Sequence, residues 1–102
     1  MTDIPETVIA AQCASTQAWA DLEAYRKRVD ADRRKTAVPP TERHRSPELR
    51  PWTAEESAEF ERLHIAAVEA ATIRRQAMQD AGIPSTWDME RDMRAAARDT
   101  GA

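Results

Sequence analysis

Proline and glycine are absent from two long stretches of this chain and are concentrated between them. Glu6–Val38 and Trp52–Ala81 contain neither residue. Four of the six prolines fall in the gap between these stretches: Pro39, Pro40, Pro47 and Pro51. Proline in a helix interior costs about 3 kcal/mol and glycine about 1 kcal/mol. The distribution therefore predicts two long helices joined by a stiff, proline-rich and arginine-rich connector.

The apolar pattern extends this prediction to an all-α fold in a single domain of 102 residues. We expect a first helix over about 4–36, a connector over about 37–52, a second helix over about 53–81 and a short third helix over about 85–98. No segment alternates between apolar and polar residues with period two, so no sheet is expected. The chain should form a helical hairpin or small bundle.

One face of the first helix carries a heptad-like apolar pattern typical of a coiled coil. Its members recur at alternating spacings of three and four: Ile4, Val8, Ala11, Ser15, Ala18, Leu22, Tyr25 and Val29. It is narrow enough for one partner helix to cover it. Thr2 or Asp3 is the expected N-cap of this helix, with Pro5 in the first turn.

The second helix has sharper signals at both ends. Thr53 and Glu56 form a capping-box pattern, and Gly82 followed by Pro84 predicts the C-terminal stop. Ser85 is the expected N-cap of the third helix. The apolar residues of the second helix span more than half of a helical wheel, which indicates contact with two neighbours rather than one.

Large apolar side chains are scarce for a chain of this length. Leu, Ile, Val and Phe together supply only thirteen residues, while alanine supplies twenty. Ordering each residue costs about 1–2 kcal/mol of backbone entropy, so these side chains offset little of that in a monomer. We therefore expect a homodimer or small homo-oligomer, or a complex with another protein. The residues expected to anchor such contacts are Trp19, Leu22, Tyr25, Phe60 and Leu63.

No catalytic signature occurs in the sequence, and the function we expect is a non-enzymatic protein–protein interaction or assembly module without a cofactor. The sequence lacks a glycine-rich phosphate loop, a Cys-x-x-Cys pair and a Ser/His/Asp signature. Cys13 has no basic residue within two helical turns, so we interpret it as a small half-buried residue.

The alternative function is nucleic-acid binding through a basic segment. Residues 26–50 hold nine Lys or Arg and four acidic residues, whereas the whole chain has a net charge of −3. Arginine forks bind phosphate well, but cations are also favoured at a helix C-terminus, and the segment precedes an acidic run that can neutralise it. The phosphate-contacting candidates are Arg26, Arg28, Arg33, Arg34, Lys35, Arg43 and Arg45.

A less favoured alternative is a ferritin-like metal half-bundle. Glu61 and His64 are three residues apart and share one helical face, as metal ligands do in di-iron bundles. Such a site also needs carboxylates from a facing helix, for which Asp21 and Glu23 are the only central candidates. A single Glu-x-x-His in a chain with eighteen acidic residues is weak evidence, so we expect no bound metal.

The remaining features concern location and origin. A single cysteine excludes an intrachain disulfide and fits a reducing compartment. No apolar run approaches the 18 residues of a membrane span, and no signal-peptide pattern opens the chain, so we expect a cytoplasmic protein. Arginine outnumbers lysine thirteen to two, which is typical of a GC-rich bacterial or phage genome.

Overall fold

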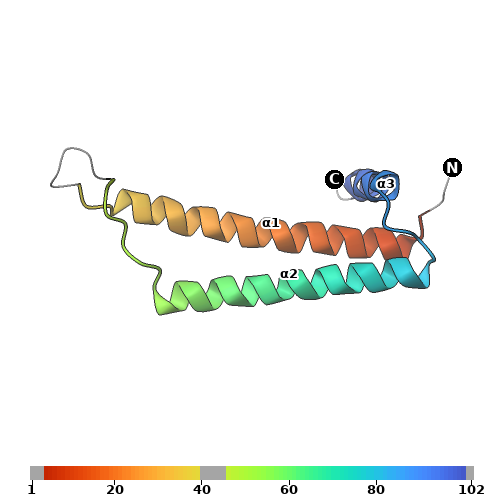
Figure 1. Cartoon of the computed structure of the whole chain (residues 1–102), viewed down its shortest axis with the longest axis horizontal. Coiled ribbons are helices and arrows are strands. Elements are labelled where there is room, and N and C mark those ends of the chain that lie inside the picture. Colours follow the sequence, from red (N-terminus) through yellow and green to blue (C-terminus); the bar gives the residue numbers. More distant parts are fainter. Residues whose placement is uncertain (1–3, 40–45, 101–102) are drawn as a thin grey trace.

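The computed structural model describes residues 4–39 and 46–100, and all three of its elements are helices. They are α1 (Glu6–Lys35), α2 (Ala54–Asp80) and α3 (Trp87–Thr100). The two long helices lie side by side and antiparallel, and α3 crosses above the N-terminal part of α1, where it is seen nearly end-on (Figure 1). The prediction of an all-α chain with two long helices and a short third one is confirmed.

The heptad-like set that runs from Ile4 to Val29, which we call the α1 seam, faces α2 along the length of the hairpin. Five of its members are buried: Val8, Ala11, Ser15, Leu22 and Val29. The other three are half-buried, which confirms the heptad-like pattern read from the sequence. Two of the five buried side chains, Ala11 and Ser15, are small and none is aromatic, so the two helices are held by a narrow contact that buries little apolar surface.

Both ends of α2 have the expected caps. The Thr53 hydroxyl accepts a hydrogen bond from the Glu56 backbone N–H at 3.0 Å, and the Glu56 carboxylate accepts one from the Thr53 backbone N–H at 2.9 Å. At the other end Gly82 has φ +69°, a conformation that side chains disfavour. The Ile83 N–H then bonds to the Met78 carbonyl at 2.9 Å, which completes a Schellman motif.

Two expected N-caps differ from the structure. α1 begins at Glu6 with Pro5 at its N-cap, and the carbonyl of Pro5 accepts from Val8 and Ile9. Proline fits there because its fixed φ suits a helix start; Thr2 and Asp3 lie outside the described residues. α3 is capped by Thr86 instead of Ser85, since the Thr86 hydroxyl accepts from the Met89 N–H at 3.2 Å.

The connector is closed by one isolated β-bridge. Val38 and Glu48 exchange two backbone hydrogen bonds, of 3.0 and 3.1 Å, in antiparallel fashion. This bridge pairs the two ends of the segment between them, and within the described residues it is the only β-pairing. Beyond it the chain runs to Pro51, and Trp52 leads into α2.

Within residues 4–39 and 46–100, one cluster of buried apolar side chains stands out, at the end of the hairpin where α3 docks. Val8 of α1, Met78 of α2 and Met93 of α3 meet there, and Val8 and Met93 are fully buried. Three half-buried neighbours pack against them: Ile4, Ala77 and Ile83. The three-helix apolar cluster therefore occupies one end of a molecule that measures 61 × 26 × 24 Å.

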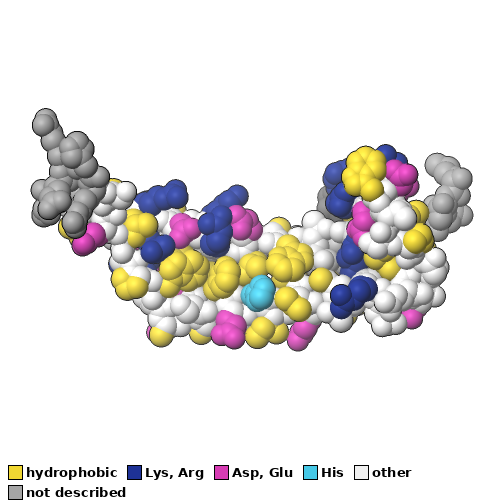
Figure 2. Space-filling model, in the orientation of Figure 1, with side chains coloured by type: hydrophobic (Ala, Val, Ile, Leu, Met, Phe, Trp, Pro, Cys, Tyr) yellow, Lys and Arg dark blue, Asp and Glu magenta, His cyan; other side chains and the backbone are white. Residues whose placement is uncertain are grey.

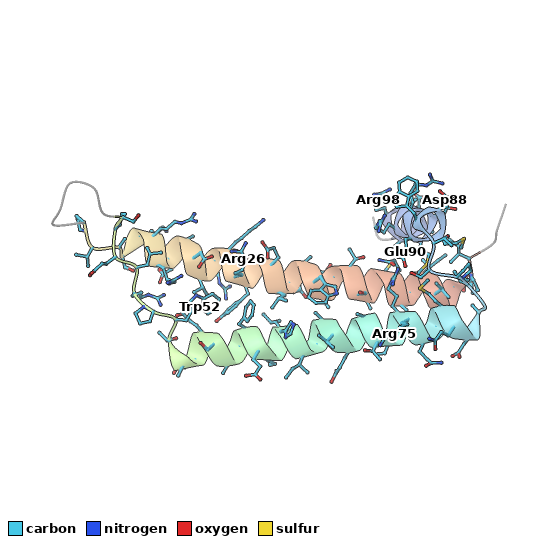
Figure 3. All side chains as sticks on the ribbon, viewed as in Figure 1. Arg26, Trp52, Arg75, Asp88, Glu90 and Arg98 are labelled. Carbon is cyan, nitrogen blue, oxygen red and sulfur yellow. The ribbon has the colours of Figure 1, made fainter. Side chains whose placement is uncertain are left out.

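A polar junction ties the same three helices together beside this cluster. The guanidinium of Arg74 in α2 donates to the side-chain oxygen of Gln12 in α1 and pairs with the carboxylate of Glu90 in α3. Ser85 adds a hydrogen bond to Glu90 at 3.0 Å. Figure 3 shows Glu90 reaching from α3 toward the hairpin. Because Arg74 and Glu90 are largely shielded from water, losing one partner leaves the other charge poorly solvated.

Replacing Met93 with alanine tests whether this end holds the core. We expect Met93→Ala to lower the free energy of unfolding by about 2–5 kcal/mol or to release α3, because a fully buried methionine is truncated. Urea unfolding followed by circular dichroism measures the loss, and hydrogen exchange of α3 amides detects release. Met89→Ala, at a half-buried position of the same helix, is the control and should cost less. Equal costs would contradict the assignment.

Candidate functional site

The candidate site is a surface along the junction of α1 and α2, away from the buried cluster. We call it the aromatic face, and it comprises Trp19, Phe60, His64 and Val68. Figure 2 shows apolar side chains gathered along this junction with a histidine among them. Trp19 of α1 lies edge-on to His64 of α2, with ring centroids 6.1 Å apart. Trp19 remains 42% exposed. Its indole therefore contacts its own chain on one side and solvent on the other.

A second aromatic group closes the connector end of the hairpin. Trp52 lies between Tyr25 of α1 and Phe60 of α2, at centroid distances of 6.4 and 5.4 Å and with steep interplanar angles. Edge-to-face packing of this kind stabilises aromatic pairs beyond the area that they bury. Figure 3 shows Trp52 at the connector end, next to the start of α2. Trp52 therefore docks the connector onto the hairpin.

The five predicted anchors are not equally available to a partner. Trp19 is exposed, and Tyr25, Phe60 and Leu63 are half-buried. Leu22 is only 8% exposed and belongs to the interior of the hairpin. We therefore use Trp19 and the half-buried residues as the candidate contact set, and assign Leu22 to the contact between α1 and α2.

An arginine clamp joins the end of α1 to the start of α2. Arg50 pairs with Asp32 of α1 at 2.7 Å and with both carboxylate oxygens of Glu56 at 2.7 and 3.0 Å. In the other direction Arg33 of α1 donates to the backbone carbonyl of Arg50 at 2.7 Å. A two-pronged arginine–carboxylate contact fixes orientation as well as charge. The clamp therefore orients the connector, a role that no local sequence pattern assigns to Arg50.

The clamp shifts the ionisation of Glu56. Hydrogen bonds from the Arg50 guanidinium and then from the Thr53 backbone N–H lower the pKa of Glu56 from 4.5 to about 2. The same pairing, led by the hydrogen bond to Glu56, raises the pKa of Arg50. Glu56 thus combines two roles at one position, the capping box of α2 and the counter-ion of the connector.

The basic segment proposed to contact phosphate is partly occupied by contacts within the chain. Arg26 pairs with Glu23 and Asp30, and Arg33 also pairs with Asp30. The Arg28 guanidinium stacks 5.1 Å from the centre of the Tyr25 ring. Arg34 and Lys35 make no ion pair within the described residues, and Arg43 and Arg45 lie outside them. Much of the basic charge is therefore neutralised by neighbouring acidic residues.

Glu61 and His64 are not part of a larger ligand cluster. Both are exposed, and the His64 ring contacts Trp19. Across residues 4–39 and 46–100, no group of three or more His, Cys, Asp or Glu side chains is arranged to hold a metal ion. The structure therefore places His64 within the aromatic face.

Several exposed apolar residues of α2 were not singled out from the sequence. Val68 is 45% exposed, and it continues the surface row of Phe60 and His64 at four-residue spacing. Ile65 and Ile73 are exposed elsewhere around α2, by 50% and 63%. The signal was present in the unusually wide apolar arc of this helix. α1 covers only part of that arc, and α3 packs mainly on α1.

Comparison with known proteins adds no functional assignment. No protein-family model, curated protein or solved structure matches this chain. Among the described helices, none combines the length and the apolar character that crossing a bilayer requires. The functional argument therefore depends on the surface and contacts of the chain itself.

The acid dependence of stability tests the clamp. Because the pKa of Glu56 is about 2 in the folded chain and 4.5 without the clamp, the unfolded chain binds more protons between these values. The contribution of Glu56 is present above about pH 4.5 and is lost as the pH falls toward 2. We expect Glu56→Gln to remove this part of the pH dependence of the free energy of unfolding.

The control for this measurement is Glu55→Gln, because Glu55 is exposed and makes no ion pair within the described residues. Urea titrations at successive pH values give the pH dependence, and carbon NMR of the Glu56 carboxyl gives its pKa directly. A titration midpoint near 4.5 in the folded protein would show that the clamp does not form.

Proposed function

We propose that this chain is a non-enzymatic assembly module whose aromatic face binds a second copy of the chain. The observation that carries the proposal is the exposure of large apolar side chains along a hairpin whose own interior is small. Trp19 and Val68 are 42% and 45% exposed on the two helices. Burying such side chains against a partner contributes most to the free energy of association.

The total surface of the chain supports the same proposal. The accessible surface is 7691 Å² for a mass of 11.5 kDa. A compact monomer of this mass exposes about 5,800 Å², so this chain exposes about 1,900 Å² more. A stable interface typically removes about 800 Å² from each partner. The excess surface is therefore large enough to supply such an interface.

The elongated shape explains where this surface comes from. The radius of gyration is 19.1 Å, whereas a compact domain of about 100 residues has about 13 Å. Two helices lying side by side each bury one side and leave the remaining sides in water. A second hairpin laid against the aromatic face would complete a four-helix bundle, the arrangement in which a wide apolar arc has two neighbours.

Truncating Trp19 tests this function. We expect light scattering to show a dimer for the natural chain. Its thermal unfolding midpoint should rise with protein concentration. Trp19→Ala should weaken association by about tenfold or more, because the indole is the largest exposed side chain of the aromatic face. Helix content should stay unchanged, since in the described part of the chain the Trp19 ring contacts one other ring, that of exposed His64.

Trp87→Ala is the matched control for this variant. Trp87 is 71% exposed on α3 and stacks under the Arg91 guanidinium, outside the aromatic face. Its loss should leave association unchanged. A natural chain that stays monomeric at high concentration, with a midpoint independent of concentration, would overturn the proposal.

Nucleic-acid binding is the second candidate function, and one observation favours it. Arg34 and Lys35 are exposed at the end of α1 without an ion pair among the described residues. Charge-driven binding to a generic duplex would weaken steeply as salt rises. Arg34→Gln with Lys35→Gln should then reduce the salt slope, and an absence of binding at low salt would exclude this function. For either function we propose a reducing, cytoplasmic setting, since the one cysteine cannot form an intrachain disulfide.

A further inference from the structure

A cavity of about 390 Å³ lies between α1 and α3, outside the aromatic face. Its wall from α1 consists of Cys13, Thr16 and Gln17. Its wall from α3 consists of Arg94, Ala97 and Arg98. The volume falls within the range of about 300–1,000 Å³ that is usual for small-molecule sites.

Two positive charges face this cavity without a counter-charge. Arg94 and Arg98 are one helical turn apart on α3. Neither forms an ion pair within the described residues, although α3 pairs Arg91 with Asp88 and Asp92. Figure 3 shows Arg98 and Asp88 as separate side chains projecting from α3. A carboxylate or phosphate between the two guanidiniums would relieve their repulsion and accept hydrogen bonds from their N–H groups.

Cys13 and Ala97 add apolar surface to the lining, and few of the other groups compete for a ligand. Ala97 is buried at the contact between the helices, and the Cys13 thiol lies 3.6 Å from the Ala97 backbone carbonyl. The Gln17 amide already donates to Asp21, and the Thr16 hydroxyl already accepts from Gln12. An apolar body therefore fits against Cys13 and Ala97 better than a second polar group does.

We propose that this cavity binds a small amphipathic anion, with its carboxylate held by Arg94 and Arg98 and its apolar part lying against Cys13 and Ala97. The proposal does not depend on the assembly function, because the cavity and the aromatic face are lined by different residues. A ligand here contacts both α1 and α3, so binding also stabilises the docked position of α3 by mass action.

Octanoate, octanamide and inorganic phosphate are the probes for this site. Octanoate has both the charge and the apolar body, octanamide keeps the body without the charge, and phosphate keeps the charge without the body. We expect octanoate to bind at millimolar concentration or tighter in titration calorimetry, and each of the other two to bind about tenfold more weakly or not at all. Octanoate should also slow hydrogen exchange of the α3 amides.

The double variant Arg94→Gln/Arg98→Gln should weaken octanoate binding about tenfold or more while preserving helix content, because both side chains are exposed. Arg75→Gln is the matched control; Arg75 is an exposed arginine of α2 that lacks an ion pair among the described residues. NMR chemical shifts should locate the ligand at Cys13, Thr16 and Ala97.

Three outcomes would overturn the assignment. They are no octanoate binding at millimolar concentration, equal binding of octanoate and octanamide, and shifts that map to Trp19 and His64 instead of the cavity. Equal binding of phosphate and octanoate would overturn the amphipathic character of the ligand. Since none of these measurements reports on dimer formation, the site and the assembly function can fail separately.

Discussion

The contact between the α1 seam and α2 is the interaction on which the rest of the structure depends. It is long but narrow, because its buried members include alanine and serine as well as Val8, Leu22 and Val29. Such a contact aligns two rods at close approach while burying little apolar surface per residue. Other contacts therefore hold the two ends of the hairpin together, and apolar side chains along its sides stay exposed to solvent.

The two ends are secured by different chemistry. At the connector end an arginine clamp and three edge-to-face aromatic rings, with Trp52 at their centre, set the entry into α2. At the opposite end the Met93 cluster and the Arg74 junction bring three helices together. The clamp is partly exposed and weakens with salt and acid, whereas the methionine cluster does not depend on charge. The middle of the hairpin, where Trp19 lies, has neither kind of support.

The sequence was sufficient for the features that depend on neighbouring residues along the chain. Thr53 and Glu56, Gly82 and the α1 seam all act within a few residues or with a fixed helical period, so local rules described them well. Contacts between distant segments were beyond those rules. Nothing local distinguishes Arg50 from the other arginines of the basic segment, and Arg74 reaches Gln12 across sixty-two positions. The partial exposure of Trp19 and the burial of Leu22 likewise depend on where α2 lies, which composition alone does not determine.

The β-bridge between Val38 and Glu48 has a consequence for how the chain tolerates change. The bridge brings the two ends of the intervening segment to hydrogen-bonding distance, and the clamp and Trp52 then fix the path into α2. The placement of the long helices thus depends on the two ends of that segment and not on its length. The entropic cost of closing a loop grows only slowly with residue number. A longer or shorter segment between Val38 and Glu48 should therefore leave the geometry of the hairpin unchanged.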